Sequence, residues 1–435
     1  MFHSPKMGAP SVLAVVLAGG RGSRLFDLTD NQPKPALPVG TSGRLIDFTL
    51  ANIVHSGIKR ALVLTQYLPE HLHRHLDQRW RPIRETHGLT LDVIDGSDKG
   101  LFNGTADAVA KVVQDVDQAA PSHVVILAGD HLYQMDYSRF VARHVESGAQ
   151  VTVGAVQVPI EEAREFGVMA LAANGRIMEF LEKPANPKSM AGKPGFALAS
   201  MGIYVFEWAL LRTLLKGLMS HEPELDFGRH VLPRLVQAGT AFAYELPARG
   251  QAAPLWRDLG TLDAYHAIHA DLEQGKVPLD PAWPLLVGRS RPPALRSALF
   301  TIPNDAQGVS PVWTGCAIGE GARVGSHCAL KRVVILPGAY VGNDVRITDA
   351  IITSDAVVPD GFNLEAALDL SDGWCTISEG GVRVISARAL TKLAQHDPEY
   401  RAVRASAPRP QAGAWRGPSG ANSKVAERRR YLEDE

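Results

Sequence analysis

The sequence contains little cysteine and no excess of charge of either sign. Only three cysteines occur in 435 residues, and none of them lies in a CxxC pair. This argues against a disulfide framework or a zinc site and is typical of a reducing compartment. Lys and Arg number 45 against 46 Asp and Glu, so no general electrostatic field attracts nucleic acid or an acidic membrane. Any anion-binding site must therefore be local.

The N-terminal region also lacks a long hydrophobic run. Residues 1–11 contain no apolar stretch of signal-peptide length, and the apolar run Val12–Ala18 is too short to span a bilayer. We interpret that run as a buried strand. We expect a cytoplasmic protein that binds neither membranes nor nucleic acid.

What the sequence does contain is alternation of strand-like and helix-like segments up to about Leu272, which predicts a parallel or mixed sheet with helices on both faces. The expected strands are Val12–Ala18, Ala61–Thr65, His123–Leu127, Val151–Val156, Ile177–Leu181 and Gly202–Phe206. The expected helices are Arg44–Ser56, Pro69–Arg79, Ala106–Val116, Tyr137–Ser147 and Phe227–Gln237. We place this α/β domain at 12–274, after an N-terminal extension at 1–11.

A different pattern begins after a proline-rich connection at 275–309. Apolar residues recur six positions apart in two series: Ile318, Val324 and Leu330, then Ile335, Val341 and Ile347. This period, with small residues at the corners, is typical of a β-helix built from hexapeptides, so we expect such a domain at 310–395. Ordinary strands with glycine turns are the alternative, which the repetition disfavours. The polar segment 396–435 is predicted to be a disordered tail.

The most informative local feature is the glycine-rich loop Leu17–Leu25, which follows the first strand. Its backbone N–H groups can face phosphates, and its arginines, Arg21 and Arg24, stay charged at any physiological pH. The spacing is neither G-x-G-x-x-G nor G-x-x-x-x-G-K-[ST], which disfavours a dehydrogenase or a P-loop NTPase. A plain strand-to-helix turn is the alternative. Shortly afterwards, Lys34 stands between two prolines that restrict its backbone.

Two aspartates and a second lysine complete the set of candidate site residues. Asp130 follows an apolar strand, at the edge where ligands of open α/β sheets bind, and a carboxylate there is a natural Mg²⁺ ligand. Asp258 is a second candidate, although either aspartate alone is more often a helix cap or turn residue. Lys183, which stands between Glu182 and a proline, is conformationally restricted and suited to neutralise a substrate phosphate.

Together these pieces resemble the bacterial and plant ADP-glucose pyrophosphorylases, over roughly residues 12–390. Besides the glycine-rich loop, the matching segments are Arg44–Phe48, Thr65–Tyr67, Gly104–Val109, Gly129–Tyr137, Phe166–Met169, Ser200–Phe206, Asp226–Gly228 and Trp256–Thr261. The resemblance implies a Rossmann-like nucleotidyltransferase domain with a mixed sheet, followed by a left-handed β-helix of hexapeptide repeats. It further implies a homotetrameric enzyme that converts ATP and glucose 1-phosphate to ADP-glucose and pyrophosphate, for glycogen or other α-glucan synthesis.

The resemblance also assigns roles to single positions. It implies that Asp130 and Asp258 hold the catalytic Mg²⁺ and that Arg24 and Lys34 lie at the ATP phosphates. The positions that match the nucleotide site are Gly19, Gly20, Gln66, Gly104 and Thr105. Those that match the glucose 1-phosphate site are Phe102, Gly167, Glu182, Lys183 and Ser200. The attacking phosphate oxygen is already anionic, so the implied chemistry needs alignment and charge neutralisation rather than a protein nucleophile.

The chain departs from the family pattern in segments tied to regulation. Ser42 replaces an activator-site lysine, Leu101–Phe102 replaces an aromatic pair, and the segment 370–375 lacks the family's arginines. Lost cationic groups remove charge-assisted hydrogen bonds of about 1.5–3 kcal/mol each, so we expect weak responses to phosphorylated activators. Two alternatives stay open: a pyrophosphorylase for another nucleoside diphosphate sugar, and a non-catalytic regulatory subunit. The presence of both aspartates and all three basic residues disfavours the second.

Overall fold

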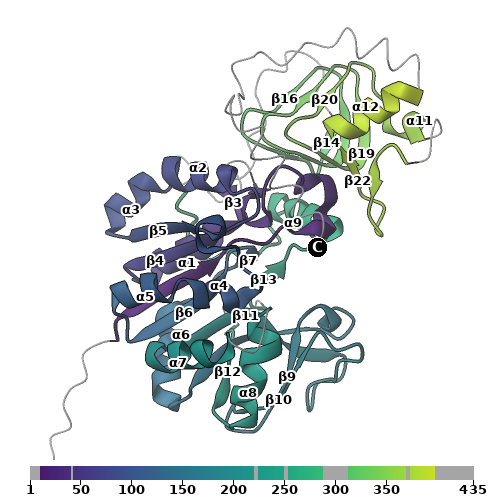
Figure 1. The fold of residues 1–435 in the computed structure, drawn as a ribbon. Coiled ribbons are helices and arrows are strands. Elements are labelled where there is room, and N and C mark those ends of the chain that lie inside the picture. The colour runs from purple at the N-terminus through teal and green to yellow at the C-terminus, as the bar shows by residue number, and fades with distance from the viewer. Residues whose placement is uncertain are drawn as a thin grey trace, which may run out of the picture.

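A nine-stranded mixed sheet organises the N-terminal part of the chain (Figure 1). The computed structural model describes residues 10–40, 43–219, 224–248, 253–287, 312–368 and 373–396. The first strands of the sheet are parallel: β1 (Val12–Leu17) pairs with β4 (Arg60–Thr65) and β6 (His123–Ala128), and β4 pairs with β5 (Thr90–Asp95). The α/β class predicted from the sequence is confirmed.

On the other side of β6 the strand pairs are antiparallel, except that Val151–Ala155 pairs in parallel with Ala241–Glu245. The long strand β11 (Phe196–Glu207) pairs with β6, with β8 (Val151–Pro159) and with β9 (Gly167–Leu171). The sheet continues from β9 to β10 (Ile177–Glu182) and from β8 to β12 (Ala241–Glu245). The register of β11 against β8 shifts between Ser200 and Tyr204, and such an irregularity bends a strand. The sheet therefore branches at β11, which pairs with β9 in one branch and with β8 in the other.

Helices cover both faces of the sheet, because successive strand residues point to opposite sides. In β1, Ala14 and Val16 pack into one core cluster and Leu13 and Val15 into the other. The helices of the first cluster are α1 (Leu45–His55), α2 (Glu70–Gln78), α3 (Arg81–His87) and α6 (Tyr137–Ser147). Those of the second are α4 (Thr105–Lys111), α5 (Val113–Ala119), α7 (Trp208–Leu218) and α8 (Leu232–Gln237).

Local sequence explains where these helices begin and end. α6 starts after Asp136, whose carboxylate accepts a hydrogen bond from the Ser138 N–H (2.9 Å), and it ends at Gly148 with φ 62°. Its predicted bounds are confirmed. The predicted helix Ala106–Val116 is instead two helices, because the backbone at Val112 (φ −107°, ψ 18°) is not helical. The predicted helix Phe227–Gln237 begins with a π-helical turn, η5 (Phe227–Val231).

The C-terminal domain is the β-helix that the apolar period predicted. One parallel face contains β14 (Val312–Thr314), β15 (Ala317–Ile318), β17 (Ala329–Ile335), β19 (Arg346–Ile352) and β22 (Arg383–Ile385), with β21 (Thr376–Ile377) antiparallel to β22. A second face contains β16 (Arg323–Val324), β18 (Tyr340–Val341) and β20 (Val357–Val358). Apolar side chains of α11 (Leu364–Leu368) and α12 (Ala387–His396) join its interior.

One coil of this β-helix takes 17 residues. The Ser326 N–H donates to Asn343 Oδ1 (2.8 Å) and the Asn343 N–H donates to Asp360 Oδ1 (2.7 Å), each 17 residues further along the chain. Left-handed backbone recurs at the same interval, with φ 57° at His327, 57° at Asp344 and 71° at Gly361. The two six-residue series recognised in the sequence are therefore separated by a shorter step. The hexapeptide pattern is present, but its coil is one residue short of three full repeats.

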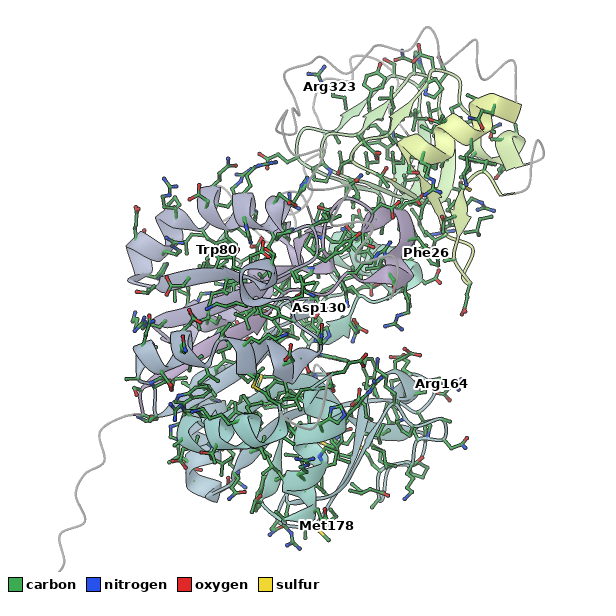
Figure 2. The ribbon with its side chains drawn as sticks, viewed as in Figure 1. Phe26, Trp80, Asp130, Arg164, Met178 and Arg323 are labelled. Carbon is green, nitrogen blue, oxygen red and sulfur yellow. The ribbon has the colours of Figure 1, made fainter. Side chains whose placement is uncertain are left out.

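A shared apolar cluster joins the two domains. It contains residues of η1 (Ser23–Leu28) and α9 (Leu262–Glu273) from the first domain, together with Val334 and Ile351 of the β-helix. His266 Nε2 donates to the Arg332 carbonyl (2.7 Å), and side chains of both domains meet at this junction (Figure 2). Several predicted parts lie outside the described residues: 1–9 of the N-terminal extension, Ser42, 288–309 of the connection, 370–372 and the tail from residue 397. None of the described helices is long and apolar enough to cross a membrane.

The stacking of the coils generates a stability prediction. An added Cβ at Gly342 would lie 2.4 Å from Asp360 Oδ1 and 2.7 Å from the Pro359 carbonyl carbon, whereas one at Gly217, within α7, would meet nothing within 4 Å. We expect Gly342→Ala to destabilise the protein by about 1–3 kcal/mol through overpacking. Gly217→Ala, the matched control, should stabilise it by about 0.5–1 kcal/mol through helix propensity. Urea unfolding of both variants measures the difference, and equal stabilities would contradict the close stacking.

Candidate active site

The two candidate aspartates meet because two short strands pair at the sheet edge. Asp130 follows β6, and the intervening Gly129 donates its N–H to the Leu17 carbonyl (3.0 Å). The chain then forms β7 (His131–Tyr133), which pairs antiparallel with β13 (Trp256–Asp258) so that Asp258 lies opposite His131. Two carboxylates from distant parts of the sequence thus reach the carboxyl end of the parallel strands, as expected for a ligand site in an α/β sheet.

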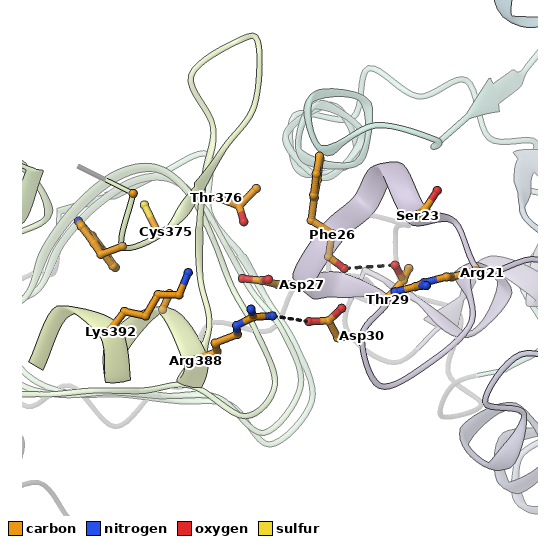
Figure 3. A pocket seen from close by; sticks show the side chains of 13 residues that line it. Arg21, Ser23, Phe26, Asp27, Thr29, Asp30, Cys375, Thr376, Arg388 and Lys392 are labelled. Carbon is orange, nitrogen blue, oxygen red and sulfur yellow. Dashed lines mark hydrogen bonds and ion pairs between the residues drawn. The ribbon is translucent and has the colours of Figure 1, made fainter. Parts of the chain in front are cut away.

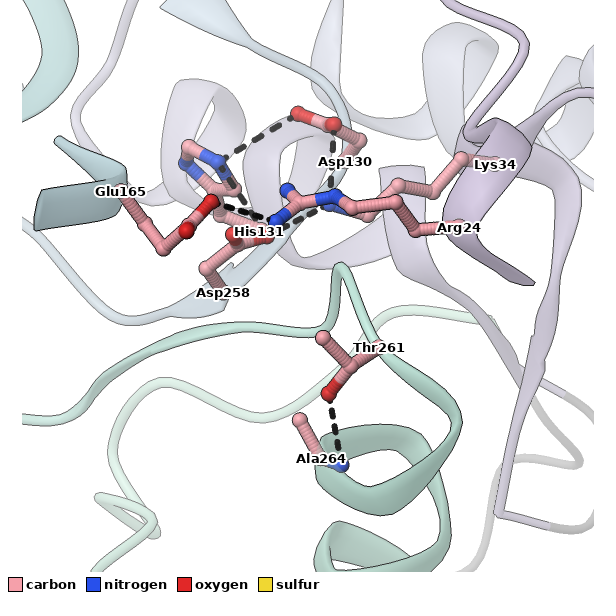
Figure 4. Close-up of polar contacts among 8 residues, drawn as sticks. All are labelled: Arg24, Lys34, Asp130, His131, Glu165, Asp258, Thr261 and Ala264. Carbon is pink, nitrogen blue, oxygen red and sulfur yellow. Dashed lines mark hydrogen bonds and ion pairs between the residues drawn. The ribbon is translucent and has the colours of Figure 1, made fainter. Parts of the chain in front are cut away.

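Lys34 lies between these two carboxylates (Figure 4). Its Nζ is 2.6 Å from Asp258 Oδ1 and 3.1 Å from Asp130 Oδ2, and its side chain is only 7% exposed. It starts the 3₁₀ turn η2 (Lys34–Ala36). Gly22 packs directly on it, since an added Cβ there would lie 2.8 Å from Lys34 Cβ and φ is 74°. The glycine-rich loop therefore closes over the lysine at a position where glycine fits.

The charges in this cluster stabilise one another. Burial alone would lower the pKa of the Lys34 ammonium, but Asp130 and Asp258 together raise it above its usual value. Burial alone would raise the pKa of Asp130, but Lys34 and then His131 lower it to about 2. The cluster is thus one ammonium shared by two carboxylates at neutral pH, which leaves a net negative charge.

His131 is a member of the site that residue-by-residue inspection of the sequence did not single out. Its Nε2 is 3.6 Å from Asp130 Oδ1 and 3.8 Å from Asp258 Oδ1. Its ring stands edge-on to Trp256 (5.3 Å between centroids), and its buried Nδ1 has no hydrogen-bond partner among the described residues. Its place directly after Asp130 in the Gly129–Tyr137 segment was the available signal.

The two arginines of the glycine-rich loop have different partners. Arg24 extends across the front of the carboxylate pair, where its Nη1 is 2.6 Å from Glu165 Oε2 (Figure 4). Arg21 instead lies over the ring of Tyr67, 5.4 Å from its centroid. Glu165 belongs to η4 (Ala163–Glu165), just before β9. Nothing in the sequence pattern indicated that Glu165 contacts Arg24.

The predicted nucleotide-site residues fall into two neighbouring groups. Gln66 Nε2 donates to the Phe102 carbonyl (3.2 Å), and Gln66 Oε1 accepts from the Phe102 N–H. Gly19 packs against Gln66, because an added Cβ would lie 3.2 Å from Gln66 Cβ, whereas one at Gly20 would meet nothing within 4 Å. Phe102, assigned by the resemblance to the sugar site, is thus held by a residue of the nucleotide group.

The second group is centred on Asp226. Thr105 Oγ1 donates to Asp226 Oδ2 (2.7 Å) and accepts from the Phe227 N–H (3.1 Å). Gly104 has φ 108°, and an added Cβ would lie 2.4 Å from the Leu225 carbonyl oxygen. The tight contact with Leu225 fixes the start of α4 next to the turn that begins η5. Asp226 was part of a matching segment, but its sequence context did not predict this contact.

Apart from Phe102, the predicted sugar-phosphate residues lie on β9, β10 and β11 or directly after β10. Gly167 and Glu182 are opposite each other in the β9–β10 pair, and an added Cβ at Gly167 would lie 3.0 Å from Glu182 Oε2. Burial and the nearby Asp226 raise the pKa of Glu182. Lys183 follows in left-handed backbone (φ 46°), and the buried Ser200 lies on β11, the strand beside β9. This group of residues combines a carboxyl, an amino and a hydroxyl side chain.

A separate cavity of about 310 Å³ lies at the domain junction rather than at the carboxylate pair (Figure 3). Asp27 and Asp30 of the first domain line it opposite Arg388 and Lys392 of α12. Ser386 Oγ donates to Asp27 Oδ2 (2.9 Å), and Arg388 Nη1 is 3.9 Å from Asp30 Oδ2. These contacts tie η1 to the end of the β-helix. Within the described residues, no group of three or more His, Cys, Asp or Glu side chains is arranged to hold a metal ion.

The shared ammonium generates a prediction for Lys34→Gln. The variant leaves two close carboxylates without their cation, so we expect the free energy of unfolding to fall by about 1–3 kcal/mol at pH 7. Because the pKa of Asp130 is depressed to about 2, the wild-type stabilisation is present above pH 4 and is lost as pH falls towards 2. The difference between variant and wild type should therefore shrink in acid. Urea unfolding at several pH values measures it.

The matched control is Lys99→Gln, which removes one partly exposed ion pair with Asp115 (2.8 Å). That change should cost about 1 kcal/mol or less. A loss of stability for Lys34→Gln no larger than for Lys99→Gln, or one that does not depend on pH, would contradict the shared-ammonium arrangement.

Comparison with known proteins gives a family match for each of the two domains. A family model described as nucleotidyl transferase matches residues 13–275, and one described as a GlmU-like C-terminal hexapeptide matches residues 312–385. A glucose-1-phosphate adenylyltransferase of Jannaschia sp. (strain CCS1) is 39% identical over 409 residues, which cover 88% of this chain and 97% of that protein. Its namesake from Roseobacter denitrificans is 37% identical over 419 residues, covering 88% and 98%.

A third protein of that name, from Paraburkholderia phytofirmans, is 38% identical over 382 residues, covering 81% of this chain and 89% of its own length. The similarity extends through both domains and over nearly the whole of each relative. This chain therefore belongs to the glucose-1-phosphate adenylyltransferases, a branch of the nucleotidyl transferase family.

Proposed function

We propose that this protein transfers the adenylyl group of ATP to glucose 1-phosphate, giving ADP-glucose and pyrophosphate. The observation that carries the proposal is the convergence of Asp130 and Asp258 on the Lys34 ammonium, with Arg24 in front of them. Such a set of anionic and cationic groups suits a reaction between two phosphate compounds. The names of the relatives support the same substrates.

The proposed reaction needs no covalent intermediate with the protein. A phosphate oxygen of glucose 1-phosphate attacks the α-phosphorus of ATP in line, the bond to the β-phosphate oxygen breaks, and pyrophosphate leaves. The attacking oxygen is anionic, so no side chain has to remove a proton. The work of the site is to align the substrates and to offset charge on the attacked phosphate and on pyrophosphate, for which Arg24 and Lys34 are the proposed groups.

The donor set at the centre of the site fits a hard divalent cation. One oxygen of Asp130 and one of Asp258 already face a single cationic group, the Lys34 ammonium. Mg²⁺ is usually bound by one or two carboxylates, with water and substrate phosphates as the remaining ligands. We propose that Asp130 and Asp258 hold Mg²⁺, which would supply charge neutralisation at the phosphates. Lys34 competes for the same oxygens and is the group we expect to turn to the substrate phosphates.

The substrates are proposed to occupy the two sides of this centre. Gly19, Gly20, Gln66, Gly104 and Thr105 are proposed to line the nucleotide side, where Gly20 leaves open space beside the loop. Phe102, Gly167, Glu182, Lys183 and Ser200 are proposed to line the sugar side, where the ammonium of Lys183 meets the sugar's phosphate. The juxtaposition of Gly167 with Glu182 supports a compact pocket for a hydroxylated ring.

The assembly, location and biological role belong to the same proposal. We propose a homotetramer that acts in the cytoplasm and supplies the glucosyl donor for glycogen or other α-glucan synthesis. The described cysteines Cys316, Cys328 and Cys375 are all free thiols, which agrees with a reducing compartment. Light scattering after gel filtration tests the tetramer. Weak activation by phosphorylated metabolites stays a prediction, because Ser42 lies outside the described residues.

The decisive experiment measures pyrophosphate release with a panel of nucleoside triphosphates and sugar 1-phosphates. ATP with glucose 1-phosphate should give the highest kcat/KM. A clear preference for another nucleotide or another sugar phosphate would replace the proposed substrates. Absence of turnover with every pair would favour a non-catalytic subunit.

We predict that Asp130→Asn and Asp258→Asn each abolish most turnover, because each removes one of two charges that act as a unit. The double variant should be scarcely slower than either single variant, as is usual for groups that act together. Steady-state rates at saturating Mg²⁺ measure this, with thermal unfolding as the check on folding. Near-wild-type turnover of folded Asp130→Asn would rule the assignment out.

We predict that Lys183→Gln raises the KM for glucose 1-phosphate far more than the KM for ATP. The reason is that its charge is proposed to meet the phosphate of the sugar and not that of the nucleotide. Lys188→Gln is a suitable control, since the exposed Lys188 pairs with Glu179 of β10 (2.9 Å). Equal effects of Lys183→Gln on both KM values would show that the lysine is placed wrongly.

A further inference from the structure

The ion pair between Arg24 and Glu165 joins opposite sides of the active site. Arg24 comes from η1, at the nucleotide side, and Glu165 comes from η4, 141 residues later in the chain. The 2.6 Å contact is made by side chains that are about half exposed (51% and 47%). In Figure 4 the two side chains reach towards each other in front of Asp258 and His131.

Arg24 is held where it screens the carboxylates. An added Cβ at Gly260 would lie 2.9 Å from Arg24 Nη2 and also 2.9 Å from Asp258 Oδ2, so the guanidinium rests on this glycine beside the carboxylate. The same guanidinium also forms the ion pair with Glu165. A nucleotide phosphate that is to pair with Arg24 must therefore compete with a carboxylate already in place.

Arg21, the other arginine of the glycine-rich loop, has a partner of a different kind. Arg21 lies over the ring of Tyr67, whose face attracts a cation without supplying a full negative charge. A phosphate approaching Arg21 meets no competing anion in that contact. Among the described residues, the two arginines of the loop thus have partners of different kinds: Arg24 pairs with a carboxylate and Arg21 with an aromatic ring.

Glu165 is well placed to connect the two substrate sides. The next residue, Phe166, packs against Trp256 of β13 (5.1 Å between ring centroids), and its carbonyl accepts a hydrogen bond from the Lys183 N–H (3.1 Å). Gly167 of the proposed sugar site follows immediately. The carboxylate that holds Arg24 therefore belongs to the same short segment that supports Lys183 and Gly167.

We propose that Glu165 is a latch: in the nucleotide-free enzyme it holds Arg24 across the site, and ATP displaces it when a phosphate takes over the guanidinium. This inference rests on the proposed function, which supplies the nucleotide. Glu165 is a positioning residue that acts through Arg24: it keeps the guanidinium paired before substrates arrive, and it thereby lowers the affinity for ATP. Phosphate can displace Glu165 because it can form two parallel charge-assisted bonds with a guanidinium, whereas the contact with Glu165 is the one bond from Arg24 Nη1 to Oε2.

The expected effect is modest, because both side chains are half exposed. Exposed ion pairs are weak and screened by salt, so removing this competitor should tighten ATP binding by about two- to fivefold at low ionic strength. The ratio between variant and wild type should shrink as salt is added. The KM for glucose 1-phosphate should not improve, since the competition concerns the nucleotide phosphates only.

The test measures the dissociation constant of ATP with Mg²⁺ and without glucose 1-phosphate, by isothermal titration calorimetry on the full chain. Glu165→Gln and Glu165→Ala are compared with wild type and with Glu162→Gln, which removes the same charge from the same turn, where Glu162 precedes η4. We expect tighter binding in the Glu165 variants and little change in Glu162→Gln. Thermal unfolding confirms that all four proteins are folded.

The outcomes separate the latch from the proposed function. If wild type makes ADP-glucose but neither Glu165 variant binds ATP more tightly than Glu162→Gln, the latch is wrong and the function stands. If the Glu165 variants bind ATP more tightly but no ADP-glucose is formed, the latch stands and the reaction is wrong. Failure of wild type to bind ATP at all overturns both.

Discussion

The pairing of one ammonium with two carboxylates is the interaction on which this site depends. Lys34 is almost fully buried, and a buried cation is tolerated only when anions and hydrogen bonds compensate for the water that it loses. That requirement fixes three separate segments against one another: the turn η2, the end of β6 and the end of β13. The glycine-rich loop then closes over the lysine through Gly22. The position of the glycine-rich loop thus follows from the need to balance the charge of Lys34.

Much of the fold could be predicted from the sequence, because its strands and helices carry local signals. The apolar run of β1 and the cap and glycine stop of α6 are examples. Asp130 could be placed as well, since the end of a buried strand in an α/β sheet is a position with a known meaning. Asp258 could be named as a second candidate, but its place beside Asp130 was implied only by the resemblance to a family, because the β7–β13 pairing is a long-range contact with no local signature.

Other features were beyond local sequence patterns for the same reason. The contact of Arg24 with Glu165 joins residues 141 positions apart, and Thr105 meets Asp226 through the packing of α4 on the turn before η5. The split of the predicted helix at Val112 depends on a backbone conformation that helix propensity alone does not encode. The shared cluster that seats η1 and α9 on the β-helix likewise depends on the tertiary fold. This cluster packs Leu25 and Leu28, which belong to the same turn as Arg24, against the β-helix.

The 17-residue coil constrains how this protein can change in length. Left-handed corners and interior apolar positions recur at that interval, so each coil sits in register on the one before it. Loss or gain of one or two residues within a coil would turn interior side chains outwards and place unsuitable residues at the corners. A whole coil can be added or removed without that conflict. The length of this domain should therefore vary in steps of one 17-residue coil. Surface loops of the first domain can instead gain or lose single residues.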